Sequence, residues 1–187
     1  MDTMNFAQHF LIAMPSLVDT PFSGTLTFIC RHDESGAMGL VVNRPTDLTL
    51  GNLLGQMSVE TTQSIWLDRH VFFGGPVQID RGFVLHRPLG EWRSTFKVSE
   101  NMGLTTSRDI LESLGHGELE DYQLMVTLGY IGWSPGQLEE EMIQNQWLSV
   151  RANADIVFET PIPMRINQVL KVLGVTRSQL SEVVGHG

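Results

Sequence analysis

Runs of apolar residues at strand length predict that the chain begins with β-structure. Phe10–Met14 is an apolar run that ends at Pro15, which is typical of a buried strand. Thr25–Arg31 and Ala37–Asn43 are two further β-rich runs, joined by the turn Asp33–Gly36. Because glycine supplies positive φ in a tight turn, we expect these two runs to form a hairpin. The first run is apolar or threonine on both faces, which indicates a central strand.

The remainder of the chain alternates strand and helix patterns. Pro45 is expected to stop the second strand of the hairpin, because proline cannot donate to a β-ladder. A one-sided helix is predicted by apolar residues at i, i+3, i+4 and i+7, with Thr49 or Asp47 as its cap: Leu50, Leu53, Leu54 and Met57. Further strands are expected at Val71–Phe73, Gly82–His86, Trp92–Val98, Tyr122–Leu128 and Trp147–Arg151. Further helices are expected at Ser107–Leu114, Pro135–Asn145, Met164–Leu173 and Arg177–Val184.

This order of elements favours an α+β fold in one domain covering residues 1–187. Strands joined by hairpins and short links indicate a largely antiparallel or mixed sheet, not a doubly wound fold with parallel strands. Seven or so short strands with many glycines would allow the sheet to curl towards a barrel. A length of 187 residues is enough for a single domain to bury a hydrophobic core.

Charge and composition argue against several classes of partner. Lys and Arg number 12 against 21 Asp and Glu, so the formal net charge is −9. This charge repels nucleic-acid phosphates and anionic lipid, and no local basic patch offsets it. No apolar run approaches the ~20 residues of a membrane helix. The single cysteine, Cys30, excludes a disulfide framework, and we predict a protein of the reducing cytoplasm.

One motif resembles an active site. Gly132-Trp133-Ser134-Pro135-Gly136 matches the G-x-S-x-G nucleophile elbow, with a predicted strand before it and a predicted helix after it. In that elbow the residue after the serine supplies an N–H to the oxyanion, and Pro135 has none. We therefore interpret Ser134 as a helix N-cap, with Pro135 at the first helical position and Gln137 completing a capping box. A serine hydrolase at Ser134 is the less favoured alternative.

The C-terminal sequence has a second motif-like pattern. Leu170–Leu180 resembles a helix-turn-helix, with Gly174 in the turn and Thr176 as the cap of the second helix. Leu170 stands where a small residue usually lets the two helices approach. We therefore predict a helical hairpin that packs on the domain, with direct binding to nucleic acid as the less favoured alternative.

Polar and glycine-rich clusters at strand ends define a candidate ligand or partner surface. Gly74-Gly75-Pro76 is interpreted as a strand-to-strand turn, with an anion-binding nest of N–H groups as the alternative. An arginine in a polar turn can bind an anion or tether a loop. The candidate residues of this surface are Asn43, Arg44, Gly74, Gly75, Arg81, His86 and Trp133. The six histidines have no metal-ligand spacing, and no nucleotide-binding motif is present, so neither a metal nor another cofactor is predicted.

Four blocks of sequence, in order, resemble the YqgE/AlgH family of bacteria. They are His9–Pro15, Gly36–Pro45, Gly74–Val77 with Asp80–His86, and Gly129–Trp133 with Gly136–Glu139. The resemblance covers nearly the whole chain. It implies a mixed, mostly antiparallel, bifurcated sheet that bends into a pseudo-barrel, with helices packed around it and a helical tail.

The resemblance implies little about activity, since the family brings no established catalytic residues. Some of its members are labelled transcriptional regulators. We predict a non-enzymatic binding or regulatory module that acts through a protein or an anionic small molecule. The alternative is an enzyme of unknown reaction, with Ser134 or His86 as its only chemical groups.

Overall fold

A computed structural model of the protein describes residues 4–14 and 23–174. The chain forms two compact units, one from Met1–Arg44 and Ile131–Gly187, the other from Pro45–Tyr130. Each unit has a cluster of buried apolar side chains of its own. The single domain of residues 1–187 stays a prediction. The expected helix Arg177–Val184, and with it the second half of the helix-turn-helix pattern, lies outside the described residues.

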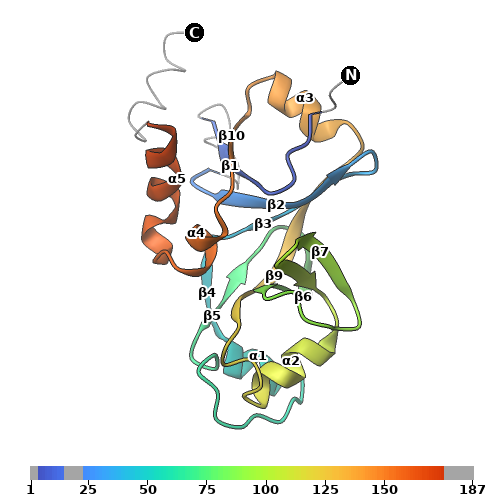
Figure 1. The fold of residues 1–187 in the computed structure, drawn as a ribbon, viewed down its shortest axis with the longest axis vertical. Helices are drawn as coiled ribbons and strands as arrows, with labels where there is room; N and C mark the ends of the chain where they lie inside the picture. The colour runs from blue at the N-terminus through green and yellow to red at the C-terminus, as the bar shows by residue number, and fades with distance from the viewer. Residues whose placement is uncertain (1–3, 15–22, 175–187) are drawn as a thin grey trace. The chain divides into compact units, whose positions relative to one another are not determined.

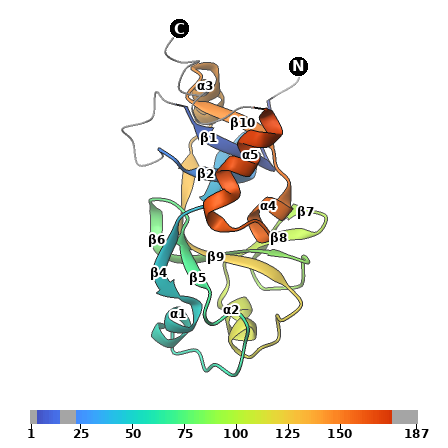
Figure 2. The ribbon, with the colours of Figure 1, turned by 90° about the vertical axis from the view of Figure 1, so that its left-hand side faces the viewer.

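The sheet of the first unit is antiparallel (Figure 1). Its strands, in order across the sheet, are β10 (Trp147–Arg151), β1 (His9–Ala13), β2 (Leu26–Asp33), β3 (Gly36–Val41) and the last residues of β9 (Gln123–Trp133). The helices described in this unit are α3 (Gln137–Ile143), α4 (Ala154–Phe158), the 3-10 helix η2 (Ile162–Met164) and α5 (Arg165–Leu173). Helix α5 covers one face of the sheet (Figures 1 and 2).

The predicted hairpin is confirmed as β2 and β3, which pair along their length. Gly36 has a φ of +126°, and a Cβ at this position would lie 2.2 Å from the carbonyl oxygen of Trp133. Glycine is therefore required in the turn. Strand β2 lies between β1 and β3, and Leu26–Cys30 are all buried, so the predicted central strand is confirmed as well.

The second unit contains a mixed sheet. Its strands, in order, are β4 (Pro45–Thr49), β5 (His70–Phe73), β9, β6 (Val77–Arg87), β8 (Met102–Thr105) and β7 (Thr95–Ser99). Strand β5 runs parallel to β9, and the other pairings described in this unit are antiparallel. Helices α1 (Leu50–Gln56) and α2 (Arg108–Gly115) contribute leucines and Ile110 to the core of the unit.

Strand β9 is the point at which the sheet divides. Its residues Thr127 and Leu128 pair with β5, whereas Ile131–Trp133 pair with β3. In the second unit the strands curl around one another as in a half-barrel (Figure 2). The predicted fold class, an α+β fold with a mixed, mostly antiparallel and bifurcated sheet curled into a pseudo-barrel, is confirmed.

The start of α1 follows the prediction from the sequence. The helix begins after Thr49, whose side chain accepts a hydrogen bond from the backbone N–H of Asn52 at 3.2 Å. This contact satisfies one of the free N–H groups of the first helical turn. Of the two caps considered, Thr49 is therefore the correct one.

Short elements account for most of the differences from the prediction. Pro45 ends no strand but begins β4, a position where the missing N–H is tolerated. Strand β8 and helix α4 were not expected, and β7 covers only the second half of the run Trp92–Val98. Phe96 is 43% exposed although the alternation placed it inside, whereas Val98, two residues further along the same strand, is 7% exposed.

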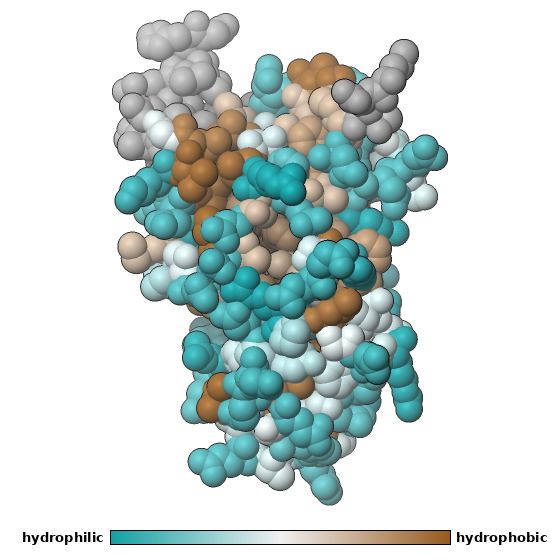
Figure 3. Space-filling view, in the orientation of Figure 1, coloured by the Kyte–Doolittle hydropathy of each residue, from teal (hydrophilic) through white to brown (hydrophobic). Residues whose placement is uncertain are grey.

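Exposed apolar side chains are scattered over several elements. On the face seen in Figure 3, hydrophilic residues predominate and hydrophobic ones form separate small patches. The exposed apolar side chains of the described chain include Ile79 on β6, Ile143 on α3 and Val172 on α5. Within residues 4–14 and 23–174, no helix has the length and apolar character needed to cross a membrane.

Candidate functional site

The Gly132–Gly136 motif forms a turn, and the predicted N-cap at Ser134 is wrong. The Gln137 N–H donates to the carbonyl oxygen of Ser134 at 3.0 Å, which closes a four-residue β-turn. Gly136 has a φ of 78° and a ψ of −10°, as in a type II turn, which favours proline followed by glycine. The Pro135-Gly136 pair therefore delays the helix, and α3 begins at Gln137 with Gly136 as its N-cap.

Ser134 is engaged by the side chain of Gln137. Its Oγ donates to Gln137 Oε1 at 3.1 Å, and its backbone N–H donates to the same oxygen at 2.9 Å. The second contact is one half of the expected capping box. Within the described part of the chain, the side-chain hydrogen bonds of Ser134 are made with Gln137, and none involves a histidine.

Asn43 and Arg44 tether the loop that precedes β2. Asn43 accepts the backbone N–H of Leu26 at 2.9 Å and donates to the carbonyl oxygen of Gly24 at 3.0 Å. The Arg44 guanidinium donates to the carbonyl oxygen of Ser23 at 2.6 Å. Both side chains thus stabilise the backbone of their own unit.

Gly74 and Gly75 form the predicted turn between β5 and β6. A Cβ at Gly74 would lie 2.4 Å from the carbonyl oxygen of Gly129, and a Cβ at Gly129 would lie 2.2 Å from that of Gly75. Two stretches of backbone therefore pack directly against each other here. This close approach explains the glycines without a ligand.

Arg81 and His86 both lie on β6 but in opposite environments. Arg81 is exposed, with its guanidinium carbon 5.8 Å from the centre of the Phe83 ring. His86 is fully buried, with Nδ1 3.0 Å from the carbonyl oxygen of Pro88 and Nε2 2.6 Å from Thr105 Oγ1. Burial lowers the pKa of His86 from its ordinary value. The ring is therefore neutral and held by neutral partners.

Trp133 points into the core of the first unit. Its indole N–H donates to Glu141 Oε1 at 3.0 Å, and the N–H of Trp147 donates to the same oxygen at 2.8 Å. The two indole rings meet edge to face at 6.0 Å. Trp133 is 5% exposed, so its side chain packs inward.

The seven candidate surface residues divide between the two units. Asn43, Arg44 and Trp133 belong to the first unit, and Gly74, Gly75, Arg81 and His86 belong to the second. Within the first unit, the side chains of Asn43 and Arg44 bind the loop before β2, whereas the side chain of Trp133 binds Glu141 of α3 and packs on Trp147 of β10. A ligand surface made of all seven residues stays a prediction.

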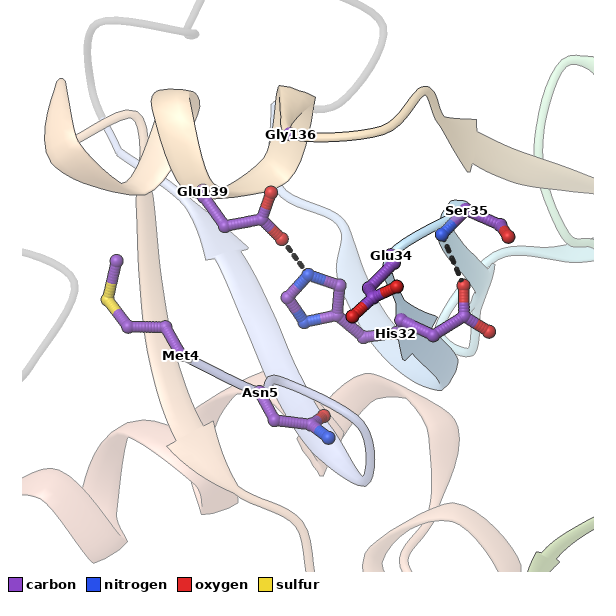
Figure 4. A pocket seen from close by; sticks show the side chains of 8 residues that line it. Met4, Asn5, His32, Glu34, Ser35, Gly136 and Glu139 are labelled. Carbon is purple, nitrogen blue, oxygen red and sulfur yellow. Dashed lines mark hydrogen bonds and ion pairs between the residues drawn. The ribbon is translucent and has the colours of Figure 1, made fainter. Parts of the chain in front are cut away.

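The structure brings together a different set of residues around a cleft of about 700 Å³ in the first unit (Figure 4). We call this the His32 cleft. It is lined by Met4, Asn5, His32, Asp33, Glu34, Ser35, Gly136 and Glu139. Three separate stretches of chain supply these residues: the segment before β1, the end of β2 with the turn that follows it, and the N-cap and first turn of α3.

His32 is held at both of its ring nitrogens. The backbone N–H of Phe6 donates to Nδ1 at 2.9 Å, so Nδ1 acts as the acceptor and carries no proton. The proton must then reside on Nε2, which donates to Glu139 Oε1. The His32 side chain is 3% exposed and that of Glu139 is 30% exposed. The buried ring of His32 is thus hydrogen-bonded to the carboxylate of Glu139, which remains partly exposed to solvent.

Helix α3 is fixed on both sides by carboxylates. Glu139 meets His32, and Glu141 accepts the two indole N–H groups and a third hydrogen bond from Gln137 at 2.9 Å. Residues two apart on a helix point to opposite sides. Glu141 therefore fixes one side of α3 to the tryptophans of the sheet, and Glu139 fixes the other side to His32 at the cleft. Glu141 is therefore a positioning residue for Glu139.

The cleft is negatively charged. Asp33, Glu34 and Glu139 line it, and no lysine or arginine is among its lining residues. Arg31 approaches Asp33 at 3.8 Å, but both side chains are nearly half exposed, so the pair is weak. In the described part of the chain no three His, Cys, Asp or Glu side chains are arranged to hold a metal ion.

The residues of the His32 cleft are not among the candidates predicted from the sequence. His32 and Glu139 are 107 residues apart, and no spacing rule connects them. Three consecutive glutamates, Glu139–Glu141, have the composition of a solvated helix face, although Glu139 and Glu141 both bind buried side chains. A usable signal was the apolar strand Leu26–Cys30, because the two-residue alternation beyond it turns His32 inward.

Comparison with known proteins identifies the family. A family model described as AlgH-like matches residues 10–178. UPF0301 proteins of Nitrosospira multiformis and of Dechloromonas aromatica are each 50% identical to the chain over 186 residues, which is 100% of both sequences in each case.

Solved structures agree with this assignment. The solution structure of the AlgH protein from Pseudomonas aeruginosa is 37% identical, with a TM-score of 0.79, and the match covers 97% of this chain and 95% of that one. The crystal structure of a Corynebacterium diphtheriae protein is 16% identical, with a TM-score of 0.69 over 97% of this chain and 93% of that one, and shows a shared fold. The resemblance inferred from the four sequence blocks is confirmed, and the chain belongs to the AlgH-like family.

Proposed function

We propose that the protein is a non-enzymatic binding module and that the His32 cleft is its binding site. The observation that carries the proposal is the state of His32, a buried ring with both nitrogens already engaged at the wall of an open cavity. A general base needs a ring nitrogen free to take a proton. His32 has no free ring nitrogen, and its role in this proposal is to hold the wall of the cleft in place.

The other reactive side chains support the same conclusion. The Ser134 hydroxyl is bound to Gln137, and both nitrogens of His86 are bound within the core. Burial raises the pKa of the Cys30 thiol to about 12, so the nucleophilic thiolate does not form at neutral pH. An enzyme of unknown reaction stays the alternative, with Ser134 as the group to test first.

Any regulatory role belongs to this proposal. A net charge of −9 opposes direct contact with DNA. Regulation would then run through whatever occupies the His32 cleft, in a protein that we place in the cytoplasm and expect to act as one domain.

A fragment screen by NMR tests the proposal. With the ¹⁵N-labelled full chain and a library of cationic, anionic and neutral fragments, we expect saturable shifts at residues 32–35 and 136–139. Ser35→Trp places a large ring in the cleft from an exposed position and is expected to remove those shifts. The matched control is Ser94→Trp, at an exposed serine of the other unit that does not line the cleft.

The enzyme alternative has its own measurement. Esterase and phosphoesterase substrates are assayed with the wild-type protein and with Ser134→Ala. Turnover that depends on Ser134 would overturn the non-enzymatic proposal, whereas fragment binding without such turnover supports it.

A further inference from the structure

We infer that the His32 cleft recognises one protonated amine or guanidinium group carried on a short apolar stem. This inference rests on the proposed binding function and specifies its ligand. Two sources share the required chemistry: a free alkylamine, and the lysine or arginine side chain of a protein partner.

The state of His32 determines the charge of the site. Because Nδ1 accepts the Phe6 N–H, the ring is neutral and brings no positive charge next to Glu139. The carboxylate of Glu139 is therefore hydrogen-bonded but not neutralised. The neutral imidazole of His32 orients the carboxylate of Glu139 without offsetting its charge. The full negative charge of the carboxylate can therefore attract a ligand.

Glu139 has an oxygen available for that ligand. Oε1 takes the hydrogen bond from His32, and no residue of the described chain donates to Oε2. Gly136 lines the cleft beside this oxygen, and even an added Cβ there would stay 3.9 Å from Oε2. The missing side chain thus leaves space for a donor group to approach.

The remaining walls suit the same ligand. Glu34 is exposed, lines the cleft and has no ion-pair partner among the described residues, so it supplies a second negative charge. Met4, 49% exposed, supplies a flexible apolar surface for an alkyl stem. An anion would face these carboxylates with no lysine or arginine in the lining to offset them.

The test is an NMR titration of the ¹⁵N-labelled full chain with probes matched in length. n-Butylammonium and N-acetyl-lysine amide are the cationic probes, and butyrate is the anionic one. We expect both cations to shift residues 32–35 and 136–139 saturably, and butyrate to leave them unchanged. Raising the salt concentration is expected to weaken the binding.

Two substitutions locate the charge that matters. Glu139→Gln keeps an acceptor for His32 and removes the charge, so the affinity for the cations is expected to fall about tenfold or more, the effect of a lost charged hydrogen bond. Glu140→Gln removes the same charge one residue away, where the side chain accepts from Gln144 and does not line the cleft. It is expected to change the affinity less than about twofold, as for an exposed charge.

The outcomes separate the inference from the proposed function. Binding of butyrate as tight as that of the cations, or no change in Glu139→Gln, overturns the inference and leaves a binding cleft. A cleft that responds to no fragment of any charge overturns both. A lysine embedded in a Gly-Lys-Gly peptide that binds more tightly than n-butylammonium indicates a protein partner, and equal affinities indicate a free amine.

Discussion

His32 and His86 are both buried histidines with both ring nitrogens engaged, yet they sit in different kinds of site. His86 is fully enclosed in the second unit, and its partners are a carbonyl oxygen and a threonine hydroxyl. His32 lies in the wall of a cleft in the first unit, and one of its partners is a carboxylate that solvent reaches. The two rings also carry their proton on opposite nitrogens.

The difference shows why burial alone does not identify a functional histidine. A ring held by neutral groups in a sealed core stabilises the fold, and its own chemistry is suppressed. A buried ring that is hydrogen-bonded to a partly exposed carboxylate fixes the position of that carboxylate at a surface where a ligand can bind. The charge and exposure of the partner, more than the histidine itself, distinguish the two sites.

The largest effect is expected from His86→Ala. The substitution leaves a cavity and removes one of the two hydrogen-bond partners of the buried Thr105 hydroxyl, the other being Thr95, so the free energy of unfolding should fall by about 3 kcal/mol. Urea denaturation measures this loss. His70→Ala, at an exposed histidine of β5 in the same unit, is the control and should cost less than about 1 kcal/mol. Equal losses in the two variants would mean that the His86 network contributes nothing specific.

Glu141→Ala should have the next largest effect. Two buried indole N–H groups lose their acceptor, so a loss of about 2 kcal/mol in unfolding free energy is expected. Because Glu141 fixes α3, binding of a cation at Glu139 should weaken as well. Thermal and urea unfolding, followed by the NMR titration, test both effects.

The control for Glu141→Ala lies on the same helix. Glu140→Ala removes an exposed carboxylate whose recorded contact is with Gln144, and it should change the stability by less than about 0.5 kcal/mol. If the two variants behave alike, Glu141 does not anchor the helix.

The sequence predicted those parts of the molecule that depend on local chemistry. The hairpin around Gly36, the helix capped by Thr49 and the central strand β2 follow from turn glycines, capping side chains and apolar runs. These signals act within about ten residues, which is why they can be recognised in a single sequence.

The sequence did not predict features whose local signals are too short or compete with one another, nor features that depend on distant partners. Strand β8 is only four residues long and has too few positions to show a period. The type II turn at Pro135-Gly136 competed with a capping pattern, and the turn prevailed because proline followed by glycine suits it better. The cleft requires a histidine of β2, a glutamate of α3 and the segment before β1 to meet, and only the folded chain brings them together.

A smaller effect is expected from pH. Burial lowers the pKa of His86 below its ordinary 6.5 in the folded protein, so the unfolded chain takes up a proton at higher pH than the folded one does. The contribution of the neutral His86 ring to the free energy of unfolding is therefore fully present above pH 6.5. It falls as the pH drops below 6.5, by up to about 1.4 kcal/mol for each pH unit.

Urea unfolding at pH 7.5 and pH 5.5 measures this contribution. His86→Gln removes the titrating ring, so its loss of stability between the two values should be smaller than that of the wild type. His70→Gln, at an exposed position, should keep the wild-type difference. A wild-type protein as stable at pH 5.5 as at pH 7.5 would show that His86 takes up its proton without cost.

The smallest effect, and the most direct check of the comparison, is the position of one proton in each ring. A carbonyl oxygen can only accept, so the contact with Pro88 requires a proton on Nδ1 of His86, and Nε2 accepts from Thr105. A backbone N–H can only donate, so the contact with Phe6 requires an unprotonated Nδ1 on His32 and a proton on Nε2.

Two-bond ¹H–¹⁵N correlation spectra of the imidazole rings at pH 7.5 distinguish these tautomers, with His32→Gln and His86→Gln to assign the signals. If His32 shows a protonated Nδ1, the Phe6 contact is absent, Glu139 can face a charged ring, and the cleft loses the uncompensated charge that would attract a cation.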